Sequence, residues 1–170
     1  MAFATCAPTD HYCHEMKIRE LIGPHKTAKE NKVFVGERGV AKIFHTEDFK
    51  ENLRRQELAS VHGYGPLLLS SGAIGKSQKY IVTEKLHPVL TLTKEDRETL
   101  QNQLVDMHTY GGHMHGDIHF GNILRTTTGE ARWSDFDLGQ SVRSSKVARA
   151  KDLASEQEDV VNIRPRVIIA

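Results

Sequence analysis

The first part of the chain alternates short apolar runs with turn residues. Runs at residues 17–22, 32–35 and 40–44 are separated by Gly23-Pro24 and by Gly36-Glu37-Arg38-Gly39. Short runs bounded by glycine and proline are typical of β-strands. The pattern therefore predicts three strands, of which the last two form a hairpin.

The next segment changes from strand to helix and back. Residues 47–61 contain few β-branched residues and many Glu, Lys, Arg and Gln, which predicts a helix that ends near Gly63. Apolar runs at 67–69 and 80–83 predict two more strands on either side of a turn that contains glycine and serine. A small antiparallel sheet with one helix is expected up to residue 86.

A helix opens the second part. Thr93 is followed three residues later by Asp96, a variant of the capping box that begins many helices. Apolar residues then recur at helical spacing, so the helix runs to about Tyr110. These apolar positions are Leu100, Leu104 and Met107.

The remaining pattern predicts a hairpin and a last helix. Residues 127–129 form its turn, residues 131–136 the following strand, and residues 146–161 the helix. This order indicates an α+β fold. The expected division is a leader at 1–15, a sheet-containing lobe at 16–86, a helical lobe at 87–161 and a tail at 162–170.

Composition excludes several classes of partner. The formal net charge is +1, so no overall field indicates nucleic acid. No apolar run approaches the ~20 residues of a membrane span, and residues 1–13 do not resemble a signal peptide. We expect a cytoplasmic or otherwise intracellular protein that is not bound to a membrane. Cys6 and Cys13 are interpreted as reduced thiols, because their spacing, even with His11 and His14, fits no common zinc site.

The chemistry is concentrated in two short segments. The first is His115-Gly116-Asp117-Ile118-His119-Phe120-Gly121-Asn122, and the second, Trp133-Ser-Asp-Phe-Asp-Leu-Gly139, contains Asp135. Phosphoryl transfer from ATP needs one carboxylate to orient the attacking hydroxyl, and an amide with a second carboxylate to hold Mg²⁺. Asp117, Asn122 and Asp135 supply that set.

These segments resemble the catalytic loop and the metal-binding motif of protein kinases and of aminoglycoside-phosphotransferase-like kinases. The resemblance implies a two-lobed, protein-kinase-like fold that uses ATP and Mg²⁺. It implies catalytic roles for Asp117 and His119, with His115 packed behind the loop, and metal ligation by Asn122 and Asp135. Asp137 replaces a usual glycine, as it does in the aminoglycoside-kinase-like families.

The same resemblance assigns nucleotide contacts in the first lobe. Val40-Ala41-Lys42-Ile43 is similar to the strand that presents a lysine to the phosphates, and Glu57 is the expected partner of Lys42. Residues 22–33, with only one glycine, stand where kinases have a glycine-rich loop. Either Lys26, Thr27 or Lys29 replaces its phosphate contacts, or these are ordinary turn residues. The remaining implied nucleotide contacts are Ile22, Gly23, Val33, Thr83 as gatekeeper, Glu84 and Leu86.

The second lobe is short, and only 34 residues follow Phe136. Its spacing is similar to the small kinase subunit of the tRNA-modifying KEOPS complex and, more loosely, to RIO kinases. The resemblance implies that Asp152 ties down the catalytic loop. Gly116 replaces an arginine, so control by loop phosphorylation is not expected. We expect the tail to pack on its own lobe, with a homodimer or a partner protein covering the rest.

The sequence therefore predicts a Ser/Thr protein kinase with ATP and a protein substrate as partners. Two alternatives stay open: a small-molecule kinase of the aminoglycoside type, and a pseudokinase-like binding module. A metallohydrolase cluster built from His113, His115, Asp117 and His119 is less favoured, because the chain has no histidine after His119.

Overall fold

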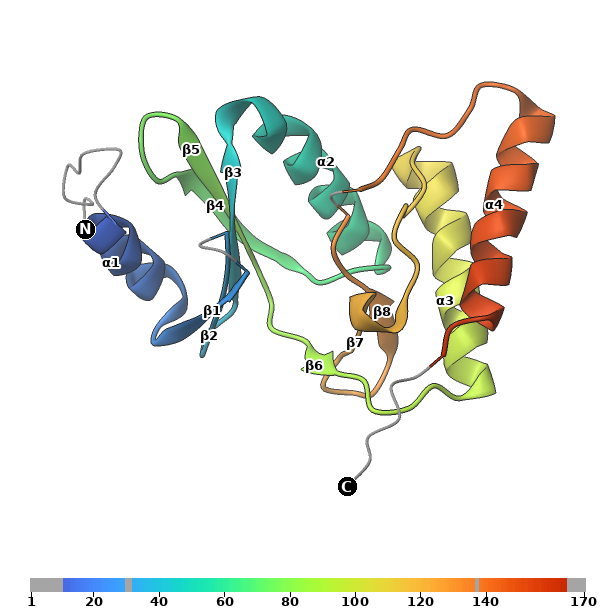
Figure 1. Ribbon diagram of the computed structural model, residues 1–170, viewed down its shortest axis with the longest axis horizontal. Coiled ribbons are helices and arrows are strands. Elements are labelled where there is room, and N and C mark those ends of the chain that lie inside the picture. Colours follow the sequence, from blue (N-terminus) through green and yellow to red (C-terminus); the bar gives the residue numbers. More distant parts are fainter. Residues whose placement is uncertain (1–10, 30–31, 137, 165–170) are drawn as a thin grey trace. The chain divides into compact units, whose positions relative to one another are not determined.

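The computed structural model describes residues 11–29, 32–136 and 138–164. They fall into two compact units. The first contains residues up to 54 and residues 67–85, and the second contains residues 55–66 and residues from 86 onwards. Helix α2, Thr46–His62, begins in the first unit and ends in the second, and the predicted helix is confirmed there (Figure 1).

The first unit is built on a five-stranded sheet in the order β1-β2-β3-β5-β4. All four pairs of neighbouring strands are antiparallel, and the predicted hairpin joins β2 to β3. Strand β1 was not predicted, because it lies inside residues 22–33, the segment interpreted as a phosphate loop. The strands are β1 His25–Lys29, β2 Val33–Gly36, β3 Val40–His45, β4 Leu68–Ala73 and β5 Gln78–Thr83.

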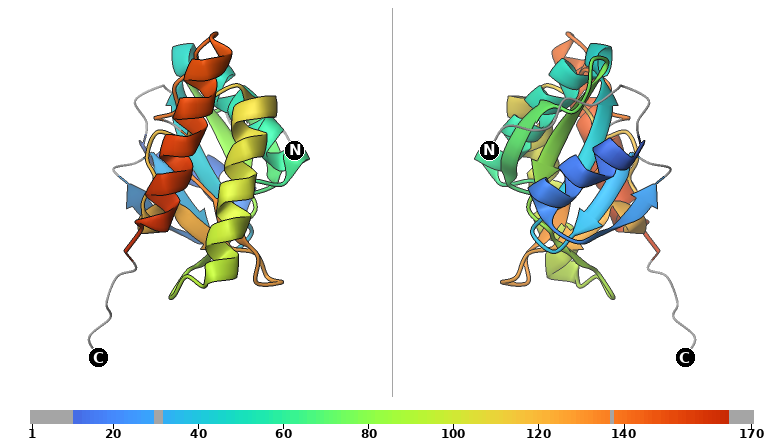
Figure 2. Two further views of the ribbon diagram at one scale, coloured as in Figure 1. Left: turned by 90° about the vertical axis from the view of Figure 1, so that its right-hand side faces the viewer. Right: turned by 90° about the vertical axis from the view of Figure 1, so that its left-hand side faces the viewer.

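Helix α1, His11–Ile22, corrects the prediction of a strand at residues 17–22. Ile18 and Ile22 lie one helical turn apart and are both buried, in a core shared with Phe34. Helical spacing of the apolar residues therefore outweighs their local strand-like run. Gly23 ends the helix with φ of 81°, and its N–H donates to the Arg19 carbonyl at 2.8 Å. Helix α1 packs on β2 and β3 (Figures 1 and 2).

The second unit combines helices with a three-stranded sheet in the order β6-β7-β8. The predicted helices are confirmed, and the predicted hairpin joins β7 to β8. The last strand ends at Trp133 rather than at Phe136. The elements are β6 His87–Pro88, α3 Lys94–Asp106, a π-helical turn Met107–Gly111, a 3-10 turn Phe120–Asn122, β7 Ile123–Arg125, β8 Ala131–Trp133 and α4 Lys146–Val161.

Helices α3 and α4 lie side by side (Figures 1 and 2). The capping box at Thr93 and Asp96 is present, as predicted. Trp133 is fully buried, and its indole N–H donates to the Leu100 carbonyl of α3 at 3.0 Å. This bond fixes the hairpin, and with it the segment that carries Asp135, against α3.

The beginning of the tail packs on this unit. Ile163 is 7% exposed and joins the core, and the Arg97 guanidinium donates to the carbonyls of Val160 and Ile163 at 2.6 and 2.9 Å. Residues 165–170 lie outside the described residues. Among the described helices, none has the length and apolar character to cross a membrane.

Candidate active site

The Asp117 loop runs from the end of α3 to β7 and is paired with the segment that follows Asp135. The Met114 N–H donates to the Gln140 carbonyl at 2.7 Å, and the Val142 N–H donates to the Gly112 carbonyl at 3.0 Å. These backbone bonds hold the segments next to the two sequence motifs against each other.

Gly116 allows that close approach. Its φ is 85°, and a Cβ at this position would lie 2.3 Å from the Leu138 carbonyl oxygen. A side chain at this position is disfavoured both by the positive φ and by the lack of space for a Cβ. The glycine that replaces the arginine of regulated kinases therefore has a structural role in this chain.

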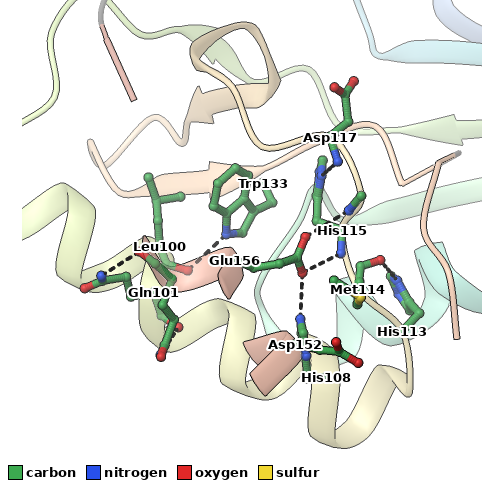
Figure 3. A network of polar contacts seen from close by, with 12 residues as sticks. Leu100, Gln101, His108, His113, Met114, His115, Asp117, Trp133, Asp152 and Glu156 are labelled. Atoms are coloured by element: carbon green, nitrogen blue, oxygen red, sulfur yellow. Dashed lines mark hydrogen bonds and ion pairs between the residues drawn. The ribbon is translucent and has the colours of Figure 1, made fainter. Parts of the chain in front are cut away.

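Glu156 of α4 anchors the loop (Figure 3). Its Oε1 accepts the His115 N–H at 2.9 Å, and its Oε2 accepts the Gly116 N–H at 3.0 Å. The His108 Nε2–H donates to Oε1 at 2.6 Å. Burial opposes ionisation of Glu156, but the bonds from His108, Gly116 and His115 outweigh it and lower the pKa of the carboxyl. The anchor is a charged carboxylate at neutral pH.

His115 is a buried, neutral residue behind the loop. Its Nε2–H donates to the Ser134 carbonyl at 2.7 Å, and its Nδ1 accepts the Asp117 N–H at 3.2 Å. Burial lowers the pKa of the imidazole, so the ring is neutral at neutral pH. The ring also packs on Trp133, with 5.0 Å between ring centroids. One side chain thereby links the backbones of the two motifs.

Asp117, His119 and Asn122 form a compact polar group. Asn122 Nδ2 donates to Asp117 Oδ2 at 2.9 Å and to the Asp117 carbonyl at 2.8 Å. The Gly121 N–H donates to His119 Nδ1 at 3.0 Å, and His119 Nε2 lies 3.2 Å from Asp117 Oδ2 and 3.0 Å from Asn122 Nδ2. The Asp117 side chain is 35% exposed. Asp117 Oδ2 therefore contacts both Asn122 and His119. Asp117 Oδ1 is the oxygen that a substrate hydroxyl could contact.

The hairpin brings the backbone of Asn122 next to the segment that carries Asp135. Ile123 pairs with Trp133, and just beyond that pair the Ser134 N–H donates to the Asn122 carbonyl at 2.9 Å. Asp135 is the next residue, with φ of 58°, a conformation that costs free energy for any residue except glycine and is found at functional sites. Because Asn122 Nδ2 is bonded to Asp117, its amide oxygen is the atom that can face a cation. An amide oxygen with a carboxylate fits Mg²⁺, which takes few protein ligands and completes its shell with water and phosphate.

Lys42 lies on β3 of the first unit, as predicted. Its cross-strand neighbours are Val33 on β2 and Ile81 on β5, so these three residues share one face of the sheet. Ala41, which points to the opposite face, is fully buried in the core with Ile18. The structure therefore brings two predicted nucleotide contacts together, Lys42 and Val33. Glu57 is exposed and belongs to the second unit, so its pairing with Lys42 stays a prediction.

The predicted hinge residues begin at the end of β5. Thr83 is buried, at 4% exposed, and pairs with Val40. The Glu84 N–H donates to the Leu67 carbonyl at 2.9 Å, and its Oε1 accepts the Leu67 N–H at 3.0 Å. The Glu84 N–H is therefore occupied, and the Glu84 carbonyl is the backbone group that could accept a hydrogen bond from an adenine. Leu86 is buried in the second unit.

The predicted phosphate loop is placed differently from the expectation. Ile22 is the last residue of α1 and is 0% exposed in the core of the first unit, and Gly23 directly follows the helix. Strand β1 ends at Lys29 and strand β2 begins at Val33, so most of the predicted loop is strand. Lys26 and Thr27 are exposed on β1, and the side chain of Lys29 lies outside the described residues. Nucleotide contact by Ile22 is incompatible with its burial, and contact by Gly23 stays a prediction.

Sequence reasoning selected the wrong carboxylate as the loop anchor. Asp152 pairs with Arg143, at 3.0 Å to Nε and 2.6 Å to Nη2, and this pair lowers the pKa of the Asp152 carboxyl. Glu156, one turn later on α4, is the residue that holds the loop. Helical spacing from Asp152 was the available signal, because it places the two carboxylates on the same side of the helix.

The metallohydrolase interpretation finds no support among the described residues, and most residues of the possible zinc site in the leader lie outside them. In the part of the chain that the structure describes, no group of three or more His, Cys, Asp or Glu side chains could hold a metal ion. Cys6 and Asp137 lie outside the described residues, as do the side chains of His11 and Cys13. His113 Nδ1–H donates to the Met114 carbonyl at 2.8 Å and is not directed with its neighbours at a common point.

Comparisons with known proteins agree with this fold. No protein-family model matches the sequence, and no curated protein sequence is significantly similar to it. Solved structures are similar. A structure of WbdD has a TM-score of 0.54 and 18% identity, covering 81% of this chain and 38% of that one. Another, described as the bifunctional kinase-methyltransferase WbdD, has a TM-score of 0.51 and 19% identity, covering 75% and 34%. The Cydia pomonella granulovirus kinase PK-1 has a TM-score of 0.53 and 12% identity, covering 75% and 59%.

The chain thus has a protein-kinase-like α+β fold with a shortened helical part, as the sequence resemblance implied. The match covers less than two thirds of the length of each of these chains. At identities of 12–19%, the likeness concerns the fold, and function must be argued from the residues.

Proposed function

We propose that this protein is an ATP- and Mg²⁺-dependent phosphotransferase that acts on Ser or Thr hydroxyls of a protein. The proposal rests mainly on one observation in the second unit. Asp117 is hydrogen-bonded to Asn122, and the hairpin brings Asn122 beside the segment that contains Asp135. The kinase-like fold of the chain supports the same conclusion. Each of these residues then has one role in phosphoryl transfer.

Asp117 orients the acceptor hydroxyl and takes its proton. The hydroxyl oxygen attacks the γ-phosphorus of ATP, the bond to the β,γ-bridging oxygen breaks, and ADP leaves with that electron pair. Asn122 Nδ2 donates to Oδ2, and His119 Nε2 lies 3.2 Å from the same oxygen, so both side chains help to fix the carboxylate rotamer. His119 is therefore proposed to act through Asp117.

Asn122 and Asp135 are the proposed ligands of Mg²⁺, which neutralises charge on the phosphates when bound. Lys42, on the face it shares with Val33, is the proposed contact to the phosphates. A lysine ammonium is a compact point charge suited to that role. Dependence on ATP also makes an intracellular location the expected one, and a homodimer or partner protein over the shortened helical part remains part of the proposal.

The test is incubation of the full chain with labelled ATP and Mg²⁺, with casein as a protein acceptor and kanamycin as an aminoglycoside. Label on Ser or Thr of casein or of the chain itself supports the proposal. Label on kanamycin alone would favour the small-molecule kinase instead. The Asp117→Asn variant is the matched control, because it changes one atom of the proposed base.

A binding module without catalysis is the second candidate. One observation favours it: β1 ends at Lys29 and β2 begins at Val33, and the sequence between them contains no glycine to let backbone amides approach phosphates. Nucleotide binding without transfer or hydrolysis in the assay above would support this candidate.

A further inference from the structure

Helix α1 and strand β1 of the first unit line a small pocket that has no part in the proposed reaction (Figure 1). Its volume is about 270 Å³. Glu15, Met16 and Arg19 come from the helix, and His25 and Thr27 come from the strand. Sites for drug-sized molecules are about 300–1,000 Å³, so this pocket fits a smaller ligand.

The pocket lies on the face of the sheet that is opposite to Lys42. Thr27 is the cross-strand partner of Phe34, and Phe34 is the partner of Ala41. Cross-strand partners share a face, whereas successive residues of a strand point to opposite faces. Thr27 therefore lies on the face of Ala41, and Lys42 lies on the other. A nucleotide held at Lys42 would leave this pocket unfilled.

The pocket is rich in hydrogen-bond acceptors. His25 Nδ1–H donates to the Gly23 carbonyl at 3.2 Å, and the ring packs edge-on against Phe34 with 5.5 Å between centroids. These contacts occupy one ring nitrogen. In the neutral ring the other nitrogen, Nε2, is an acceptor, and it has no hydrogen-bond partner in the described part of the chain. The Glu15 carboxylate and the Thr27 hydroxyl are further acceptors. Three acceptor groups match the three N–H donors of a primary ammonium group.

Arg19 supplies the opposite charge. Its planar guanidinium can bind a carboxylate through two parallel hydrogen bonds. Glu15 precedes Arg19 by one helical turn, the spacing and order at which these two residue types pair well on a helix. Among the contacts of the described residues, however, no ion pair joins them. Both charges are therefore available to a ligand, and Met16, 47% exposed, adds an apolar surface beside them.

We propose that this pocket binds a free α-amino acid with an apolar side chain. The ligand's carboxylate binds to Arg19, and its ammonium group donates to Glu15, His25 Nε2 and Thr27 Oγ. Its side chain packs on Met16. A phosphate fits this set of groups less well, because the Glu15 carboxylate would repel it. The site is separate from the proposed phosphotransferase site and does not depend on it.

The probe is leucine, added to the full-length chain and followed by calorimetric titration. Two analogues each lack one charge: leucinamide has no carboxylate, and isocaproate has no ammonium group. We expect saturable binding of leucine and at least ~10-fold weaker binding of each analogue, the loss of one charge-assisted contact. Saturating leucine should also raise the melting temperature, because it binds only the folded protein.

Two variants assign the charges to their residues. Arg19→Gln and Glu15→Gln should each weaken leucine binding by ~10-fold or more and leave the fold intact, because both side chains are exposed. The preference for leucine over leucinamide should disappear in Arg19→Gln, and the preference over isocaproate should decrease in Glu15→Gln. Lys76→Gln and Glu20→Gln are the matched controls, since they remove the same charges from exposed positions of the first unit outside the pocket.

A wild-type protein that does not bind leucine at millimolar concentration would overturn the proposal, as would equal binding of leucine and both analogues. Binding of inorganic phosphate in place of leucine would contradict it and indicate an anion site. Weaker leucine binding in the control variants would remove the assignment to this pocket. Because these titrations contain no ATP, their outcome is independent of whether the chain transfers phosphate.

Discussion

The two units hold their predicted functional residues by different means. In the second unit, the Asp117 loop is fixed by side chains: Glu156 receives two of its amides, and His115 bonds both motifs. In the first unit, Lys42 is placed by strand register, opposite Val33. The buried contacts of Glu156 and His115 fix the backbone that carries Asp117, whereas strand register fixes the backbone position of Lys42.

This difference predicts that residues of the two units have different roles. Groups that must meet a reacting atom need fixed positions, because small misplacements cost large factors in rate. A lysine that binds a phosphate tolerates more freedom, since a point charge acts over a range of distances. Substitutions in the second unit should therefore change turnover, and those in the first should change nucleotide affinity.

The largest effect is expected from Asp117→Asn. Turnover should fall by ~10²-fold or more, the contribution of a positioned acid or base, while nucleotide affinity and melting temperature stay near wild type. Steady-state kinetics and calorimetric titration with ATP measure the two separately. Unchanged turnover in the folded variant would remove Asp117 from the mechanism.

Asp135→Asn should abolish the stabilisation that Mg²⁺ adds to ATP binding. Asparagine tolerates the φ of 58° at this position, so the variant removes charge without adding backbone strain. At ligand concentrations 100 times the dissociation constant, the lost stabilisation is about 2.7 kcal/mol. Melting with ATP, with and without Mg²⁺, tests this. Equal Mg²⁺-dependent gains in both proteins would contradict ligation by Asp135.

Glu156→Gln should change the pH dependence of stability. Because the pKa of Glu156 is lowered in the folded protein, its contribution is complete above the ordinary glutamate pKa of ~4.3 and is lost as the pH falls through the folded value. The variant should lose about 1–3 kcal/mol at pH 7, the cost of a buried donor without an acceptor. Urea unfolding from pH 7 to pH 3 should show the two proteins converging in acid. Parallel curves would mean that the carboxylate charge is unimportant.

Lys42→Met tests the nucleotide-binding role proposed for the first unit. We expect ATP affinity to fall by ~10-fold or more, the loss of one charge-assisted contact, with a smaller change in turnover at saturating ATP. Lys50→Met, an exposed lysine on α2, is the control. If Lys42→Met instead lowers turnover alone, the proposed division between the units is wrong.

The sequence predicted those parts of the molecule whose signals are local. The capping box at Thr93, the hairpin at 127–129 and the helix over 146–161 all have such signals, and all three are confirmed. Residues 17–22 were assigned wrongly because six residues cannot separate strand from helix when the apolar positions fit both.

The loop anchor could not be predicted in the same way. Glu156 is 40 residues from Gly116 in the chain, and only the packing of α4 brings its carboxylate to the loop. The acidic residue chosen from sequence, Asp152, lies one helical turn away and pairs with Arg143. Motif spacing predicts the residues that would act on a substrate, but long-range packing decides which residues support them.

The smallest effect concerns the start of the tail. Ile163 is 7% exposed in the core of the second unit, and the Arg97 guanidinium bonds its carbonyl at 2.9 Å. Ile163→Val removes one methylene from this contact and should cost about 1 kcal/mol, a fall of roughly 2–4 °C in melting temperature for a chain of this size. Turnover should change little, because the Ile163 backbone bonds to Val160 and Arg97 and the variant keeps an aliphatic side chain in the core. Val161→Ala, at an exposed position two residues earlier, is the control and should melt like the wild type. Equal melting of all three proteins would show that the tail does not contribute to the core.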